Sequence, residues 1–314
     1  MSLVEMKCRW VWIVVALVLL AASWAGAPEG GVRYRVVISV TMHAQSDIRD
    51  LMLAIPALRE WSTQRDVRRV LLKFPPGGFK VKKCSGKQAD YFLFSASRVR
   101  GGTRAKFEIG FECTSFPFVM PGEGKAGSTP SKKLFQPTSN IDCDSPAVKT
   151  MVKRLKGQAT DAVEIARRFY RWIRVNIAYR SAPNPNCKAS EVIRKRAGDC
   201  LAQATLFVAM MRAAGIPARI VAGYVPKGGG SLHVWAEFFA PSHGWLPVDP
   251  AGRLFCELPH GFIVVSKGSR VRLAEGRFMT PFVFQIYNAQ WRISAEKPRF
   301  EYSVSVTPVE EKEP

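Results

Sequence analysis

The chain has 314 residues, 47% of them hydrophobic and 23% charged, and these fractions exclude a disordered, collagen-like or coiled-coil chain. Lysine and arginine outnumber aspartate and glutamate by 46 to 25, so the formal net charge is +21. A basic surface steers anions, which makes an anionic surface such as a glycan or lipid head groups a candidate partner. We expect no nucleic-acid partner, because no nucleic-acid-binding motif occurs.

Residues 1–27 have the pattern of a secretory signal peptide. Lys7 and Arg9 precede the apolar run 11–20, and the small residues Ala25-Gly26-Ala27 close the segment. A basic, then apolar, then small-residue order is typical of such signals. We therefore expect export of the remaining chain to the periplasm or the medium. If the segment is not cleaved, it would instead anchor the protein to a membrane.

Residues 28–139 are predicted to form a β-rich N-terminal domain. Hydrophobic and polar side chains alternate over 32–40, which predicts a strand with one buried face. Further strand-like runs cover 50–55, 67–74, 90–95 and 104–113, with turn clusters between them. Several short strands at this spacing favour a β-sandwich. Residues 116–146 are rich in proline, glycine and serine and read as a linker or long loop.

Helical signals begin the next region, 140–265, and strands follow them. Helices are predicted over 146–156, from about 161 onward and over 190–196. A further helix is predicted to begin at Cys200 and to end before Gly215 and Pro217. Strands are predicted over 219–225, 232–239 and 245–248, with a flexible loop at 228–230. The C-terminal extension 266–314 returns to strands, most clearly over 300–306. The fold class is therefore α+β.

Six cysteines follow the signal, and one of them has the setting of a nucleophile. No CxxC or CxxH spacing occurs, so we expect no metal site and no cofactor. Cys200 follows Gly198-Asp199 and starts a helix, where unpaired amides and the helix dipole favour the thiolate. If it is a working thiol, the other five allow at most two disulfides. The six are Cys84, Cys113, Cys143, Cys187, Cys200 and Cys256.

A thiol nucleophile needs a base, and a histidine base needs an orienting acid. His233 begins a predicted strand, and alternation places it on one face with Trp235 and Glu237. If Ala240 pairs with Gly244 in the following hairpin, Asp249 lies diagonally from His233 on that face. Glu237 is the rival orienter. The other histidines are less suitable: His243 lies in the hairpin turn, and His43 and His260 fall outside the core pattern.

Three ordered motifs resemble the transglutaminase-like superfamily. Arg196-Ala-Gly-Asp-Cys200 with the following helix resembles its nucleophile segment, His233-Val-Trp-Ala-Glu237 its histidine strand, and Gly244-Trp-Leu-Pro-Val-Asp-Pro250 its aspartate motif. The resemblance covers roughly 146–265. The family often has a small residue in place of Val234 and threonine in place of Ala251, so the substrate does not carry over.

The resemblance implies a papain-like α+β core, and the N-terminal β-sandwich is frequent in exported bacterial members. It implies a catalytic triad of Cys200, His233 and Asp249 that transfers an acyl group from a peptide or amide through a thioester. The oxyanion would be held partly by the backbone N–H of Cys200. We expect hydrolysis rather than amine crosslinking, because nothing in the sequence indicates an amine site. The expected substrate is a peptide or protein, with cell-wall peptides suggested by export. The alternative is a non-catalytic envelope module that binds an anionic or peptide ligand.

Overall fold

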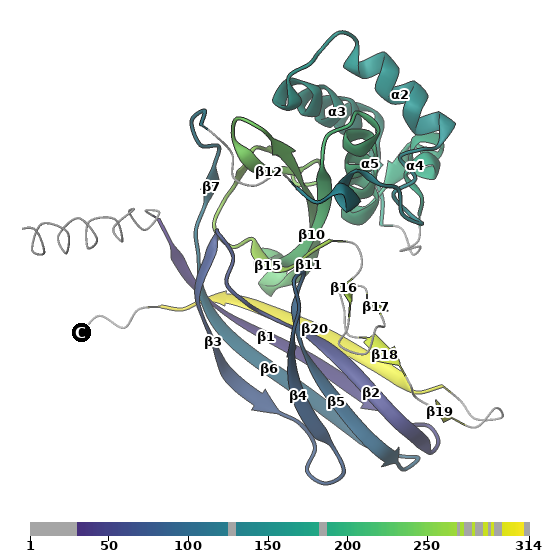
Figure 1. The fold of residues 1–314 in the computed structure, drawn as a ribbon. Coiled ribbons are helices and arrows are strands. Elements are labelled where there is room, and N and C mark those ends of the chain that lie inside the picture. The colour runs from purple at the N-terminus through teal and green to yellow at the C-terminus, as the bar shows by residue number, and fades with distance from the viewer. Residues whose placement is uncertain are drawn as a thin grey trace, which may run out of the picture.

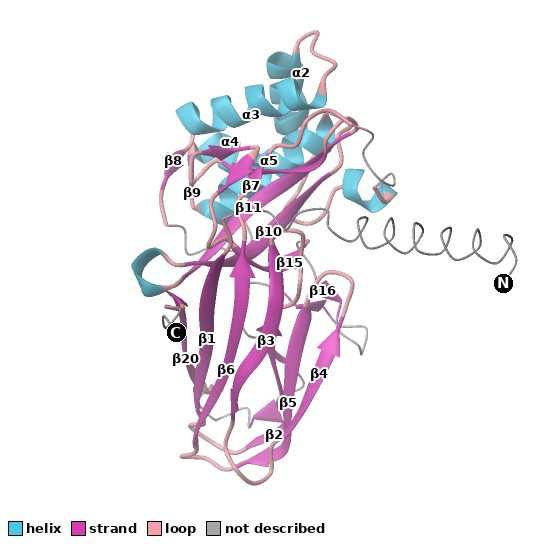
Figure 2. Cartoon of the chain, turned by 90° about the vertical axis from the view of Figure 1, so that its left-hand side faces the viewer, coloured by secondary structure: helices cyan, strands magenta, loops and turns pink. Residues whose placement is uncertain are grey.

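The computed structural model describes residues 30–124, 130–181, 187–268, 271–272, 278–279, 285–287, 290–291 and 297–310. The predicted signal peptide lies outside the described residues. Within the described part of the chain, no helix combines the length and the hydropathy needed to cross a bilayer. Strands fill one end of the molecule and helices gather at the other, with a second set of strands between them (Figure 1, Figure 2).

The N-terminal region is a sandwich of two antiparallel sheets. One sheet has the order β20-β1-β6-β3, and the other has the order β18-β2-β5-β4, with β19 also pairing β2. Aromatic rings join the two layers, and the Phe94 and Phe107 centroids lie 4.9 Å apart. The strands are β1 (Val32–His43), β2 (Ile48–Ala57), β3 (Gln64–Lys73), β4 (Lys80–Ser85), β5 (Asp90–Val99), β6 (Arg104–Ser115), β18 (Gln285–Tyr287), β19 (Gln290–Trp291) and β20 (Arg299–Pro308).

Residues from the C-terminal extension complete both sheets. β20 pairs with the full central part of β1, from Tyr34 with Pro308 to His43 with Arg299, and the two strands lie side by side as purple and yellow ribbons (Figure 1). β18 and β19 both pair with β2. The sandwich is therefore built from the two ends of the described chain, and the intervening region is inserted between them.

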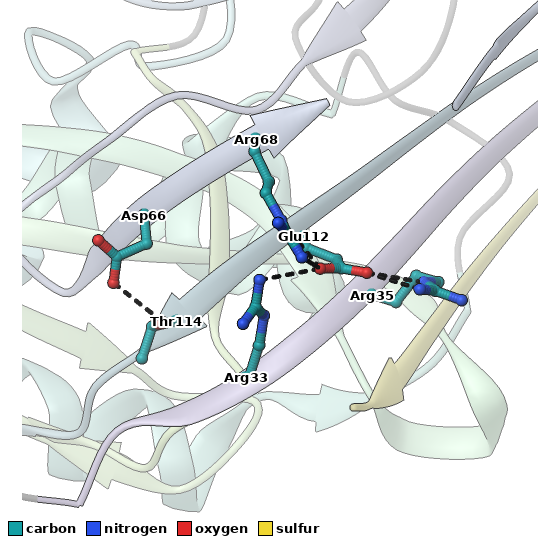
Figure 3. A network of polar contacts seen from close by, with 6 residues as sticks. All are labelled: Arg33, Arg35, Asp66, Arg68, Glu112 and Thr114. Atoms are coloured by element: carbon teal, nitrogen blue, oxygen red, sulfur yellow. Dashed lines mark hydrogen bonds and ion pairs between the residues drawn. The ribbon is translucent and has the colours of Figure 1, made fainter. Parts of the chain in front are cut away.

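A single carboxylate organises the outer face of the first sheet (Figure 3). Glu112 on β6 accepts hydrogen bonds from Arg35 at 2.6 Å and Arg68 at 2.5 Å, and from Arg33 at 3.0 Å. Hydrogen bonds from Arg35 and Arg68 lower the pKa of Glu112 from 4.5 to about 2. These contacts link β1, β6 and β3 through their side chains, in addition to the backbone ladder.

Four described helices and a five-stranded sheet form the second region. The helices are α2 (Pro146–Lys156), α3 (Ala162–Asn176), α4 (Ala189–Lys195) and α5 (Cys200–Ala213). The sheet has the order β13-β12-β11-β10-β15, with β10 (Ala218–Val225), β11 (Ser231–Ala240), β12 (Gly244–Asp249), β13 (Leu254–Phe255) and β15 (Ile263–Lys267). α5 is almost entirely buried, because it lies between the other helices and one face of this sheet. The α+β class is confirmed.

Short strand pairs and one-turn helices complete the described part of the chain. β7 (Phe118–Val119) pairs with β14 (Glu257–Leu258), β8 (Ala178–Tyr179) pairs with β9 (Ala197–Gly198), and β16 (Val271–Arg272) pairs with β17 (Phe278–Met279). One-turn 3₁₀ helices occur at Lys132–Phe135 and Lys227–Gly229. The predicted flexible loop at 228–230 is in contact with β20, because a Cβ on Gly230 would lie 2.6 Å from the Val304 oxygen.

A buried glutamine ties the sandwich to the second sheet. The Gln64 Oε1 accepts from the Val264 N–H at 2.8 Å, and its Nε2 donates to the Val264 oxygen at 3.2 Å. Nearby, the hydroxyls of Tyr224 on β10 and Tyr302 on β20 are 2.9 Å apart. Tyr224, Ile263 and Val265 also belong to the sandwich core. The two regions therefore share one continuous buried contact.

Candidate active site

Cys200 is the first residue of α5, and the chain before it is held tightly. The Asp199 side chain caps the helix by accepting from the Ala202 N–H at 2.9 Å. A Cβ on Gly198 would lie 2.5 Å from the Ala202 Cβ, so only glycine fits this approach to the helix. The half-buried Cys200 side chain thus lies at the helix end where unpaired N–H groups favour a thiolate.

His233 is placed by β11 and by the aromatic residues around it. It pairs with Gly223 of β10, and a Cβ on Gly223 would lie 2.1 Å from the Ile263 oxygen of β15. The His233 ring stacks against Trp235 with centroids 6.2 Å apart, and the edge of Phe262 packs against it at 5.9 Å. These contacts fix the plane of the imidazole within a largely apolar surrounding.

Asp249 ends β12 and is fully buried. The hairpin has the predicted register, since Ala240 pairs with Gly244 and Ala236 with Val248. Asp249 is therefore diagonal to His233, and its Oδ2 lies 2.6 Å from the His233 Nε2. Its other oxygen, Oδ1, accepts from the Gly252 N–H at 2.8 Å. Both carboxylate oxygens are thus hydrogen-bonded, which holds the side chain in one orientation.

The side chains of Cys200 and Asp249 both act on His233. Burial by itself lowers the pKa of His233, but hydrogen bonds to Asp249 and Cys200 and their negative charges outweigh it and raise the pKa to about 10. Since Nε2 is bonded to Asp249, Nδ1 is the nitrogen left for the Cys200 sulfur. The imidazole therefore carries its positive charge at neutral pH, next to the Cys200 sulfur.

The rival orienter has other partners. Glu237 lies on the same strand as His233, but its Oε2 accepts from Arg219 at 2.7 Å and its Oε1 from Lys267 at 2.7 Å. The ammonium of Lys267 and the guanidinium of Arg219 lower the pKa of Glu237 against the effect of burial, which raises it. Glu237 is thus part of a separate ion-pair cluster and does not contact the imidazole.

The remaining histidines are engaged elsewhere in the fold. His43 contacts Glu301 at 3.1 Å and His243 contacts Ser242 at 2.8 Å. The Nδ1 of His260 lies 2.8 Å from the hydroxyl of Tyr34 on the sandwich. His260 also lines the same cleft as Cys200, a position that the sequence pattern did not indicate.

The cleft has a volume of about 870 Å³, and Cys200, His233 and Asp249 are among the residues that line it. Tyr179 enters it because β8 pairs with β9 in a register that sets Tyr179 opposite Gly198, two residues before Cys200. Phe262 and His260 enter from the loop that packs on the sandwich. Sequence reasoning missed these three residues, because each reaches the cleft through a contact with a distant part of the chain.

The other described cysteines do not share the position of Cys200 at a helix start beside a histidine. Burial raises the pKa of Cys113 and of Cys256 to about 12, and Cys84 and Cys143 are buried as well. All six described cysteines are present as free thiols. Among the described residues, no group of three or more histidine, cysteine, aspartate or glutamate side chains is arranged to hold a metal ion.

Comparisons with known proteins agree on the fold of the second region. Residues 149–250 match the model of the family described as the Transglutaminase-like superfamily. A stretch of 66 residues is 44% identical to a protein-glutamine gamma-glutamyltransferase of Pseudomonas aeruginosa. That match covers 18% of this chain and 10% of the relative, so the chain spans about a tenth of the curated relative's length.

Two solved structures are similar over most of the chain. A provisionally assigned cysteine protease from Cytophaga hutchinsonii is 16% identical, with 92% of this chain and 94% of that chain covered and a TM-score of 0.65. The likeness therefore includes the sandwich as well as the second region. The periplasmic domain of TgpA from Pseudomonas aeruginosa, bound to ethylmercury, is 18% identical, with 72% of this chain and 90% of that chain covered and a TM-score of 0.34.

Proposed function

Residues 149–250 form a transglutaminase-like domain, a fold of the papain-like cysteine-protease type, and from this premise we propose that the protein is an exported thiol enzyme that transfers an acyl group from a peptide or amide. Cys200 is the nucleophile, His233 the general acid and base, and Asp249 the orienting carboxylate. The supporting observation is that three side chains from α5, β11 and β12 meet in one cleft, with 2.6 Å between His233 Nε2 and Asp249 Oδ2.

The first half of the reaction follows from the raised pKa of His233. Its imidazolium lies next to Cys200 and stabilises the thiolate, which attacks the carbonyl carbon and forms a carbon–sulfur bond. The negative charge moves to the carbonyl oxygen, which the backbone N–H of Cys200 at the start of α5 would stabilise. His233 Nδ1 then gives its proton to the amide nitrogen, the carbon–nitrogen bond breaks, and the amine leaves.

The second half regenerates the thiolate. Neutral His233 removes a proton from a water molecule, whose oxygen attacks the thioester carbonyl, and the carbon–sulfur bond breaks to release a carboxylic acid. An amine in place of water would give a new amide. We propose water as the acceptor, because the described residues of the cleft include a single carboxylate, Asp249, and that group is buried against His233. Within the part of the chain that the structure describes, no other acidic side chain lines the cleft to receive a cationic amine.

The test compares two half-exposed thiols of the same chain. Cys200 is expected to react with iodoacetamide at neutral pH at least about 10-fold faster than Cys187, whose pKa is raised by burial. Cys200→Ala should abolish release of acid and amine from a glutamine-containing peptide library, while the matched Cys187→Ala should not. The readouts are mass spectrometry of labelled peptides and of reaction products.

A labelled primary amine added to the reaction separates the two acceptors. Product that carries the label would show crosslinking rather than hydrolysis. Equal labelling of Cys200 and Cys187 together with no turnover would refute the enzyme and favour the non-catalytic binding module. The peptide library should include cell-wall peptides, since the predicted export would place the protein near them.

A further inference from the structure

A second, smaller pocket continues the cleft on the far side of Tyr179. It has a volume of about 360 Å³, and Tyr179 and Ala251 line both it and the cleft that contains Cys200. A peptide chain that crosses Cys200 can therefore place a neighbouring group in this pocket. The pocket is formed by the end of α3, the turn after α4 and the turn after β12.

Three arginines surround this pocket: Arg174, Arg196 and Arg253. We call it the arginine pocket. Of its described lining residues, none is acidic, and none of the three arginines has a carboxylate partner among the described residues. Arg196 donates to the Asn176 side-chain oxygen at 3.0 Å and lies over the Trp172 ring. Arg174 lies near the Tyr170 hydroxyl, and its positive charge lowers the pKa of that hydroxyl against the larger effect of burial, which raises it. Each guanidinium therefore keeps donors for a ligand.

Two carboxylates near Tyr179 have other hydrogen-bond partners. Asp199 accepts the Ala202 N–H as the cap of α5, and Asp249 is buried and bonded to His233 and Gly252. Three positive charges thus converge on a partly enclosed space next to the nucleophile. Arginine binds carboxylates through parallel, charge-assisted hydrogen bonds, which are stronger than bonds between neutral groups.

We infer that the arginine pocket binds a carboxylate of the acyl-donor peptide, so that the enzyme selects acidic peptides in which a negative charge flanks the attacked amide. This inference rests on the proposed function, since it takes Cys200 as the point of attack. The carboxylate has two sources in a peptide: an aspartate or glutamate side chain, or the C-terminus of the chain.

The experiment measures binding with Cys200→Ala protein, so that it does not depend on turnover. The probes are dansylated, C-terminally amidated peptides in which a single glutamine has glutamate before it, glutamate after it, or methionine at both positions. A fourth probe is the methionine peptide with a free C-terminal carboxylate. We expect the best carboxylate probe to bind about 10-fold more tightly than the neutral one in fluorescence anisotropy, and its identity reports the source.

Three double variants carry the comparison. Arg174→Gln/Arg253→Gln removes two charges from the pocket, and the preference should fall below about 2-fold. The matched control Arg171→Gln/Arg194→Gln removes two charges from exposed positions of α3 and α4 that do not line the pocket, and it should keep the preference. Arg174→Lys/Arg253→Lys should retain part of it, which a purely structural role for the guanidinium groups would not explain.

The outcomes separate this inference from the proposed function. Equal binding of all four probes overturns the arginine pocket even if wild-type protein turns over peptides. Equal losses in the pocket and control variants also overturn it, because the net charge of the chain would then account for the preference. A preference that disappears with the pocket variant supports the inference even if wild-type protein shows no turnover, a result that would refute the proposed function by itself.

Discussion

At the level of single residues, the two nitrogens of His233 have separate partners. Nε2 is bonded to Asp249, so Nδ1 is available to the Cys200 sulfur, and the raised pKa of the ring depends on both neighbours. The rival candidate for the carboxylate that orients His233 is excluded from that role by its ion-pair partners. Glu237 pairs with Arg219 and Lys267, and nothing in the spacing of the chain distinguishes it from Asp249.

Asp249→Asn is expected to change the pH profile of the enzyme. His233 must be protonated to release the amine, so kcat/KM falls as the pH rises through the raised pKa of about 10. Without the Asp249 charge that pKa is lower, and the alkaline limb should move toward lower pH by about 1 to 3 pH units. The pH dependence of kcat/KM for peptide cleavage measures this.

Asp144→Asn is the control for that experiment, because Asp144 is an exposed carboxylate outside the cleft. Its pH profile should match that of the wild type. If the alkaline limb of Asp249→Asn stays in place, the carboxylate does not set the protonation of His233, and the role assigned to Asp249 is wrong.

At the level of elements, the site depends on how closely β10 can approach its neighbours. Gly223 pairs with His233 on one side and follows an irregularity in the β10–β15 ladder on the other. A side chain at this position would meet the Ile263 backbone at 2.1 Å and the Trp235 ring at 2.9 Å. Because position 223 is a glycine, β10 can pair with the His233 strand β11 on one side and approach β15 closely on the other.

Gly223→Ala is expected to lower the free energy of unfolding by about 1 to 3 kcal/mol, because β15 must move to admit the methyl group. Chemical denaturation measures the loss. Gly122→Ala is the matched control, since a Cβ there meets nothing within 4 Å and should have little effect. Equal stability of the two variants would show that β15 yields easily at this position.

Local signals explain which elements the sequence predicts. Ser145, Asp161 and Asp199 all cap helices with their side chains, so the starts of α2, α3 and α5 agree with prediction. The register of the β11–β12 hairpin is also set locally, by the short turn that pairs Ala240 with Gly244. β4 was not predicted, because Lys80–Ser85 is an edge strand with one buried residue, Cys84, and a charged edge strand has little hydrophobic pattern.

Contacts between distant residues explain what the sequence did not predict. His260 reaches the cleft through Tyr34, which is 226 positions away, and no periodicity links them. The predicted linker 116–146 contributes β7, which pairs with β14 after the hairpin. The roles of Cys200, His233 and Asp249 in catalysis stay predictions, whereas their meeting in one cleft is a property of the fold.

At the level of the whole molecule, the sandwich supports one wall of the cleft. Gln64 holds both the N–H and the oxygen of Val264, and it also donates to the Arg59 oxygen at 2.7 Å. Val264 lies two residues after Phe262, which packs against His233. A change in the sandwich can therefore reach the imidazole through β15.

Gln64→Ala is expected to lower the free energy of unfolding by about 1 to 3 kcal/mol, because buried backbone groups of Val264 lose their partners. It should also lower kcat/KM, since the Phe262 wall loses its support. Gln158→Ala removes an exposed glutamine and serves as the control in both denaturation and activity measurements. Full activity in a destabilised Gln64→Ala protein would mean that the two regions are mechanically independent.

The pairing of β20 with β1 has a consequence for biosynthesis. The ribosome makes β1 near the beginning of the described chain and β20 near its end, so one edge of β1 stays unpaired while the whole intervening region, with its helices and second sheet, is synthesised. An unpaired strand edge presents free backbone N–H and C=O groups, which can pair with strands of other chains. A nascent chain of this protein therefore has a long interval in which chaperone protection of that edge matters, and the interval closes when β20 arrives.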